Sequence, residues 1–468
     1  MTGVTGRGWL PDLLYRNERF ESGVAMFADE AGLISRFSSS PEDLRKAQRL
    51  PGKALLPGLV NAHSHAFQRS IRGRTEHRTG RGRDTFWTWR EAMYQAANRL
   101  SPDDVYVVAC TAFLEMALAG ITTIGEFHYL HHTPDGTSYD DPNLLAKQVL
   151  RAAERIGLRI ALLRTVYARA GWNQSPHPAQ RRFLTPRIDR FIADTEELRG
   201  YISRFFAPGR AWAGVAPHSV RAIPLDYLLS VTEYARANGM PVHMHVAEQP
   251  AEIEACLAEH HLRPVELLHK HGIPDSRFTA VHAVHVTEGE ATMLGSSRSH
   301  VCACPTTERN LGDGGVPADR LQDAGAGICF GSDSNVQIDL LEDARELEYH
   351  LRMQKLERAV LAGDCEPGSL ACRLLANATA IGAESLGANG GRLDVGCAAD
   401  FFTVDLNDLS VAGADEGSLL SHIVFSSGRS AIRDTFVAGE AVIEDGHHRM
   451  EAEVIEQFRA VQRKLWGS

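Results

Sequence analysis

Short apolar segments that read as strands alternate with helix-like segments along the centre of this chain. One helix is predicted to begin at Ser101, a capping residue followed by proline, and to end at Gly120, which supplies a left-handed stop. The same pattern recurs, and the eight predicted strands are 54–62, 121–126, 158–165, 211–216, 241–246, 279–284, 300–304 and 326–331. Strands separated by helices form parallel sheets, and eight of them predict a closed (β/α)₈ barrel of the TIM type.

The two ends of the chain follow a different pattern. They contain short strand-like runs and turns in place of the regular alternation of helix and strand. We therefore expect an α/β protein with two domains. Residues 56–390 would form a metal-dependent catalytic barrel, and residues 1–55 and 391–468 would together form a small β-sandwich domain.

Composition and charge narrow the cellular setting. A net charge of −10 argues against a nucleic-acid or anionic-membrane partner, and no apolar stretch is long enough to span a bilayer. Residues 1–11 lack the profile of a signal peptide. The eight cysteines include no Cys-x-x-Cys pair, which is typical of a reducing compartment. We expect a cytoplasmic protein.

Residues with metal-binding and proton-transfer chemistry follow four of the predicted strands. On a strand, positions i and i+2 face the same side, so the histidines of a His-x-His pair can reach one ion. The carboxyl ends of barrel strands meet at one rim, where imidazoles and carboxylates together suit a divalent cation. The residues are His63 and His65, His245 with Glu248, His282, and Asp333. His243 shares a strand face with His245, and spacing alone leaves both as candidate ligands.

These motifs resemble the amidohydrolase superfamily over nearly the whole chain. The matching segments are 56–65, 120–123, His245 with Glu248, His282, 304–307, 331–333 and 396–401. Within the superfamily, the chain is most similar to the formimidoylglutamate deiminases of histidine degradation. The segments that carry this closer similarity are the run from residue 67 to residue 89, and residues 125–132 and 216–221.

The resemblance implies a single metal ion. It places His63, His65, His245 and Asp333 as the ligands, which selects His245 over His243. The fourth predicted strand ends in His218, whereas two-metal members of the superfamily often carry a bridging lysine there. Three nitrogens and one carboxylate leave a position for water, so we expect one Zn²⁺, although Fe²⁺ or Mn²⁺ would accept similar ligands.

The resemblance also implies an activity and the residues that perform it. The expected reaction is hydrolytic deimination of N-formimino-L-glutamate to N-formyl-L-glutamate and ammonia, by a homodimer. Asp333 would accept a proton from the attacking water, Glu248 would move a proton to the leaving nitrogen, and His282 would polarise the reacting group. The expected contacts to the dicarboxylate amidine substrate are Gln68, Tyr129, His218 and Arg221.

Two other functions are compatible with the same motifs. A related aminohydrolase would act on a purine or triazine ring, as guanine and adenosine deaminases do, and its pocket should favour stacking aromatic side chains. A non-catalytic scaffold would typically have lost ligands that are all present here. The arginine-rich stretch 69–83 either steers an anionic substrate, contacts a second subunit or forms a solvated loop.

Overall fold

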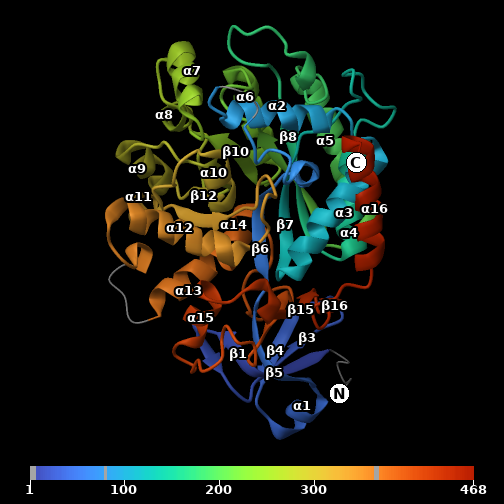
Figure 1. Ribbon diagram of the computed structural model, residues 1–468, viewed down its shortest axis with the longest axis vertical. Helices are drawn as coiled ribbons and strands as arrows, with labels where there is room; N and C mark the ends of the chain where they lie inside the picture. The colour runs from blue at the N-terminus through green and yellow to red at the C-terminus, as the bar shows by residue number, and fades with distance from the viewer. Residues whose placement is uncertain (1–6, 79–81, 363–367, 468) are drawn as a thin grey trace.

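A computed structural model describes residues 7–78, 82–362 and 368–467. One of its two eight-stranded sheets has every strand hydrogen-bonded to its neighbours in chain order and parallel to them. The strands are β6 (Leu59–Ser64), β7 (Ile121–His128), β8 (Arg159–Val166), β9 (Ala211–Pro217), β10 (Val242–Val246), β11 (Phe278–His282), β12 (His300–Ala303) and β13 (Gly327–Phe330). Helices surround this sheet, as Figure 1 shows, and the predicted TIM-like fold is confirmed.

The sheet closes where its first strand meets the segment after its last. The His65 amide donates to the Asp333 carbonyl over 2.9 Å, and the Asp333 amide donates to the His63 carbonyl over 3.0 Å. Ser64 and Asp333 thereby form a parallel bridge. Barrel closure itself therefore brings two predicted ligand segments, 270 residues apart in sequence, to the same point.

The helices begin and end with recognisable capping signals. The Ser101 side chain accepts the Asp104 amide, and the Asp104 carboxylate in return accepts the Ser101 amide, so α3 begins as predicted. The longer helices around the barrel are α2 (Phe86–Ala97), α3 (Pro102–Leu118), α4 (Leu144–Ile156), α5 (Ile188–Phe205), α6 (Leu225–Ala237), α7 (Pro250–His260), α9 (Glu288–Ser296) and α12 (Leu340–Lys355). Shorter helices are α8 (Pro264–Lys270), α10 (Pro305–Leu311), α11 (Ala318–Asp323), α13 (Ser369–Ala376), α14 (Gly382–Leu386) and α15 (Leu419–Phe425).

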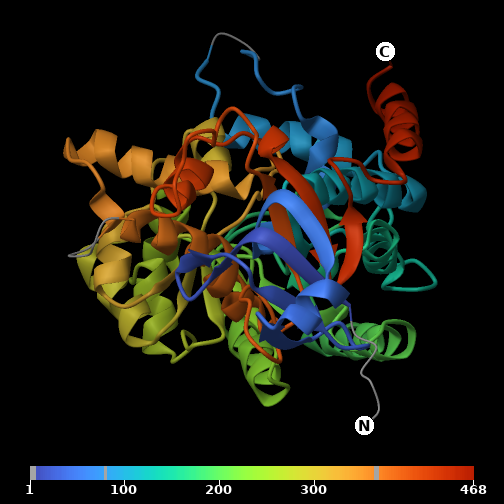
Figure 2. The same cartoon turned by 90° about the horizontal axis from the view of Figure 1, so that it is seen from below.

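A second, mixed sheet is built from both ends of the chain. Its strands are β1 (Gly8–Arg16), β2 (Arg19–Glu21), β3 (Ala25–Ala28), β4 (Ile34–Ser38), β5 (Gln48–Pro57), β14 (Phe401–Asp405), β15 (Ile432–Val437) and β16 (Glu440–Ile443). In Figure 2 the blue N-terminal and red C-terminal strands lie side by side, because β5 pairs with both β1 and β14. Helix α1 (Pro41–Lys46) belongs to this region, whereas α16 (Glu451–Trp466) packs on α3 of the barrel.

The predicted strand 54–62 is wrong in one respect, because it is two strands in two different sheets. Strand β5 ends at Pro57 and β6 begins at Leu59. Gly58 lies between them, where an added Cβ would come within 2.4 Å of the Thr122 side chain. The Pro-Gly step therefore separates the strands, and the chain leaves the terminal sheet for the barrel at this glycine.

One buried ion pair joins the barrel to the terminal sheet. Arg159 on β8 donates from Nη1 to Asp400 Oδ2 over 2.6 Å, and both side chains are less than 5% exposed. The second oxygen of Asp400 accepts the Ala438 amide over 2.7 Å.

Across the described ranges, none of the helices combines the length and the apolar character needed to cross a bilayer.

Candidate active site

The four predicted metal ligands meet at the carboxyl end of the barrel. His63 lies near the end of β6 and His65 follows that strand, His245 lies near the end of β10, and Asp333 follows β13. One potential ligand atom from each residue lies within 4.8 Å of the others, and all four side chains are buried. Asp333 Oδ1 is 3.3 Å from Nε2 of both His63 and His65. Two ligand atoms of a tetrahedral zinc ion lie about 3.3 Å apart, so this spacing fits groups that share one ion.

The hydrogen bonds of the histidines leave nitrogens available for a cation. Nδ1 of His65 lies 2.8 Å from the Phe127 carbonyl, and Nδ1 of His245 lies 3.0 Å from the His218 carbonyl. A carbonyl can only accept, so each Nδ1 carries the proton and each Nε2 keeps its lone pair. Neither nitrogen of the buried His63 ring has a hydrogen-bond partner among the described residues. Such orphaned polar atoms fit a site built to hold a metal ion.

Burial keeps these imidazoles neutral. Desolvation, reinforced by His63, lowers the pKa of His65 to about 3, and desolvation also lowers the pKa of His245 well below its usual value. Burial acts to raise the pKa of Asp333, but the surrounding histidines outweigh it and hold that pKa below its ordinary range. Three neutral nitrogens and one carboxylate therefore face the same point at neutral pH, which is the donor set of a catalytic zinc site.

A buried amide network holds the ligand segments in place. Asn335 Nδ2 donates to Ser64 Oγ (3.2 Å) and to the carbonyls of His65 (3.0 Å) and Asp333 (3.2 Å). Its Oδ1 accepts Ser332 Oγ over 2.7 Å. Both Asp333 and Asn335 have positive φ, +43° and +56°, a conformation that needs support from its surroundings. Sequence reasoning missed Asn335, although the motif around Asp333 lies only two residues away.

The predicted catalytic residues lie beside the ligand group. His282, the last residue of β11, places Nε2 3.7 Å from Glu248 Oε1 and 3.9 Å from Asp333 Oδ2. Its Nδ1 lies 3.2 Å from Oε1 of Glu308, a fully buried residue of α10 that the sequence analysis did not single out. Burial acts to lower the pKa of His282, but the neighbouring carboxylates, led by Glu248, raise it to about 10. Burial is also the main reason that the pKa of Glu248 is raised.

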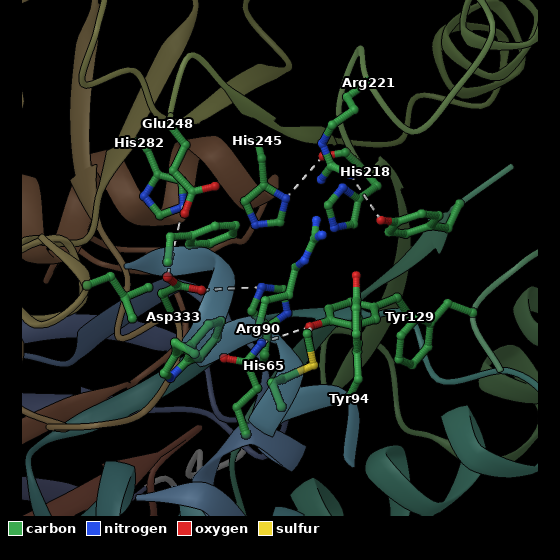
Figure 3. A pocket seen from close by; sticks show the side chains of 17 residues that line it. His65, Arg90, Tyr94, Tyr129, His218, Arg221, His245, Glu248, His282 and Asp333 are labelled. Carbon is green, nitrogen blue, oxygen red and sulfur yellow. Dashed lines mark hydrogen bonds and ion pairs between the residues drawn. The ribbon is translucent and has the colours of Figure 1, made fainter. Parts of the chain in front are cut away.

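The four predicted substrate contacts line one cavity together with these residues. Gln68, on the helical turn η1 (Ala66–Ile71), donates from Nε2 to the Tyr129 hydroxyl over 2.7 Å. The His218 ring lies 4.9 Å from the His245 ring, centroid to centroid, and Arg221 donates to the Tyr167 hydroxyl over 3.3 Å. Figure 3 shows Tyr129, His218 and Arg221 grouped on one side of His245.

The same cavity contains residues that sequence reasoning missed. Arg90 comes from α2, and Figure 3 shows its guanidinium inside the cavity with Tyr94 nearby. Trp89 of the same helix also lines the cavity. The aromatic-rich run at 86–94 was the available signal, but which of its residues reach the barrel mouth depends on how α2 lies across it. Further lining residues are Phe86, Met93, Tyr167, Phe183 and Leu311.

Part of the arginine-rich stretch 69–83 is structural. Arg69 and Arg72 both pair with Glu115 of α3, over 2.6 and 2.9 Å, and Arg72 also donates to the Asn335 carbonyl. These two arginines therefore anchor the segment after β6 instead of forming a solvated loop. Arg81 lies outside the described residues.

Comparisons with known proteins agree with this fold. The profile of the amidohydrolase family matches residues 54–442. The chain is 37% identical over 462 residues to formimidoylglutamate deiminase from Pseudomonas aeruginosa, which covers 98% of each chain. It superposes on a crystal structure of an amidohydrolase from Brucella melitensis with a TM-score of 0.89 at 33% identity, covering 98% of this chain and 99% of the other. An adenosine deaminase from Xanthomonas campestris, crystallised with bound zinc, shares the fold with a TM-score of 0.82 at 21% identity, covering 98% of both chains.

The chain therefore belongs to the amidohydrolase family, and the predicted resemblance is confirmed. This membership makes it a metal-dependent hydrolase that acts on a carbon–nitrogen bond.

Proposed function

We propose that this enzyme hydrolyses N-formimino-L-glutamate to N-formyl-L-glutamate and ammonia. The observation that carries the proposal is the presence of two arginines, Arg90 and Arg221, in the cavity that holds the ligand group. Guanidinium groups bind carboxylates in a bidentate manner, whereas a neutral purine ring offers them no charged partner. The 37% identity to the formimidoylglutamate deiminase of P. aeruginosa over 98% of both chains supports the same substrate.

We propose that His63, His65, His245 and Asp333 hold one zinc ion per chain. A divalent ion at this position would polarise a water molecule and supply the nucleophile near neutral pH. Zinc suits three nitrogens and one oxygen, and Fe²⁺ or Mn²⁺ would accept the same set.

The cavity orients the substrate by its two carboxylates. In N-formimino-L-glutamate the α-carboxylate lies closer to the reacting carbon than the side-chain carboxylate does. The donors nearest the ligand group are Tyr129, whose ring lies 4.9 Å from that of His65, and His218. These residues, with Gln68, would bind the α-carboxylate, and Arg221 with Arg90 would bind the distal one. Holding both ends places the amidine carbon beside the ligand group.

The proton transfers follow from the carboxylates around His282. Asp333 is ionised and accepts the proton of the attacking water. Glu248, whose pKa is raised by burial, gives a proton to the terminal nitrogen as the water oxygen adds to the amidine carbon. When the bond between carbon and that nitrogen breaks, Asp333 passes on the proton that it accepted, and the nitrogen leaves as ammonia. The hydroxyl of the adduct loses its proton to Glu248 as the formyl C=O forms, which restores both carboxyl groups. His282, held by Glu308 at Nδ1, directs its Nε2–H toward the developing adduct.

An ammonia-release assay tests the proposed substrate. The purified, zinc-supplemented enzyme is incubated separately with N-formimino-L-glutamate, guanine and adenosine. We expect ammonia from N-formimino-L-glutamate, with N-formyl-L-glutamate as the second product. Ammonia from a ring substrate alone would replace this proposal with a purine aminohydrolase, and no turnover of any compound would favour the scaffold.

Three predictions about organisation accompany this function. We propose the domain division at residues 55/56 and 390/391, which expression of the isolated barrel would test. We also propose a homodimer, which light scattering coupled to size-exclusion chromatography would detect. The proposed cytoplasmic location would be tested by cell fractionation.

A further inference from the structure

The end of the cavity away from the ligand group is rich in hydrogen-bond donors. Arg90, Arg221 and the hydroxyls of Tyr94 and Tyr167 gather there, and Gln180 of the turn η2 (Pro178–Gln180) lies directly behind the two phenols. Gln180 is only 2% exposed. Its Nε2 donates to the Tyr94 hydroxyl over 2.7 Å and to the Tyr167 hydroxyl over 3.1 Å.

These contacts determine where the phenol protons point. A phenol has one proton and two lone pairs. The Tyr167 oxygen accepts from both Gln180 Nε2 and Arg221 Nη1, which occupies its lone pairs. Both tyrosines are thus acceptors toward Gln180, and their own O–H groups are directed away from it. Among the described lining residues, the carboxylates are Glu248 and Asp333, which lie at the other end beside His282.

We propose that Gln180 is a positioning residue that makes Tyr94 and Tyr167 donors toward the distal carboxylate of the substrate. With Arg90 and Arg221 they form an array of donors that selects an anionic distal group over a neutral amide. A carboxylate only accepts hydrogen bonds, whereas a primary amide would direct its own N–H groups at these donors. This inference rests on the proposed function. It extends substrate recognition to Tyr94 and Tyr167 in the cavity and to Gln180, which lies behind the cavity lining.

The orientation of the Gln180 amide is the critical feature. Its Oε1 has no hydrogen-bond partner among the described residues. If an acceptor stood in place of Nε2, both phenols would donate to it and their protons would be lost to the cavity. Glutamate at position 180 creates that situation with little change in shape, because a carboxylate can only accept.

The test compares Gln180→Glu and Gln180→Met with the wild-type enzyme on two substrates. N-formimino-L-glutamate carries a distal carboxylate, and N-formimino-L-glutamine carries a distal amide. We expect Gln180→Glu to lower kcat/KM for the first substrate by about 10- to 100-fold, mainly through KM, since one or two hydrogen bonds to a charged group are lost. The preference for the carboxylate substrate should fall at least about tenfold, and Gln180→Met should fall between the two enzymes.

A matched control introduces a buried carboxylate elsewhere. Gln148 of α4 is 7% exposed and accepts from Arg151, and within the described part of the chain it donates to no residue of the cavity. Gln148→Glu should therefore keep the wild-type preference. Equal loss on both substrates in Gln180→Glu would show a merely structural role and overturn the proposal. An unchanged preference in both Gln180 variants would also overturn it.

Binding of glutarate, measured by calorimetry, separates this inference from the proposed reaction. Failure of the wild-type enzyme to turn over N-formimino-L-glutamate would refute the proposed function alone. Glutarate binding that weakens in Gln180→Glu, in Tyr94→Phe and in Tyr167→Phe would still support the donor array. Glutarate binding of equal strength in all four proteins would overturn it, and the tyrosine variants cover the case in which Gln180→Glu does not fold.

Discussion

Replacing Asn335 with alanine should weaken zinc binding although Asn335 is not a proposed ligand. The substitution removes three donated hydrogen bonds, to Ser64 Oγ and to the carbonyls of His65 and Asp333, and one accepted from Ser332. At about 1 kcal/mol each, these bonds contribute roughly 4 kcal/mol to holding the ligand segments together. Part of this lost energy had held the ligands in the arrangement that binds the metal. Mutation of a residue that hydrogen-bonds to metal ligands typically lowers metal affinity by about 10- to 100-fold. We expect a weakening in that range.

Competition with a chromophoric chelator measures the zinc affinity of the variant directly. Asn335→Gly serves as a second variant, because φ at this position is +56° and glycine relieves the backbone strain of alanine by about 1 kcal/mol. Glycine should recover part of the thermal stability and little of the zinc affinity. Asn143→Ala is the matched control, since this buried asparagine bonds the Asp194 carbonyl and Arg164, neither of which belongs to the ligand group. Wild-type zinc affinity in Asn335→Ala would refute the reasoning.

Three further predictions concern the substrate, the ligands and the domain junction. Arg221→Met should lower kcat/KM on N-formimino-L-glutamate by about 10- to 100-fold, because an ionic hydrogen bond is lost, and an unchanged value would remove Arg221 from the substrate site. The free energy of unfolding of the metal-free protein should fall as pH is lowered from about 6.5 toward 3. For His65 alone the expected slope is about 1.4 kcal/mol per pH unit, because over this range His65 is protonated in the unfolded state but stays neutral when it is buried. Thermal unfolding across this range should show a shallower slope in His65→Asn, and an equal slope would contradict that assignment. Arg159→Met should lower the free energy of unfolding by about 3–5 kcal/mol, because the buried Asp400 carboxylate loses its cationic partner, and zinc affinity should not change. A calorimetric measurement that shows no loss of stability would contradict the importance of this ion pair.

The proposed metal ligands could be found from sequence because each lies at the carboxyl end of a strand or just after it. A period-two pair such as His63 and His65, and single residues after other strands, converge once the strands are assigned to a parallel barrel. The positions of these residues relative to the predicted strands are therefore enough to predict that they lie together. Spacing alone could not exclude His243, whose Nε2 lies 3.0 Å from the Ser385 carbonyl.

The residues missed by sequence reasoning share a different origin. Arg90, Tyr94 and Gln180 come from a helix and a turn that cross the barrel mouth, and no local period determines which side chains point inward. Helix α16 was also missed, although Val454, Val461 and Leu465 are buried at helical spacing. Its position beside α3 depends on a contact between distant segments, whereas the strands before it are recognisable from local alternation.

Titration of the metal-free enzyme with zinc tests the central claim most directly. Ammonia release from N-formimino-L-glutamate is followed as zinc is added, and bound metal is measured by elemental analysis at each point. We predict that activity rises in proportion to bound zinc and reaches its plateau at one ion per chain. Full activity in the metal-free protein, or a plateau at two ions, would contradict a single ion held by His63, His65, His245 and Asp333.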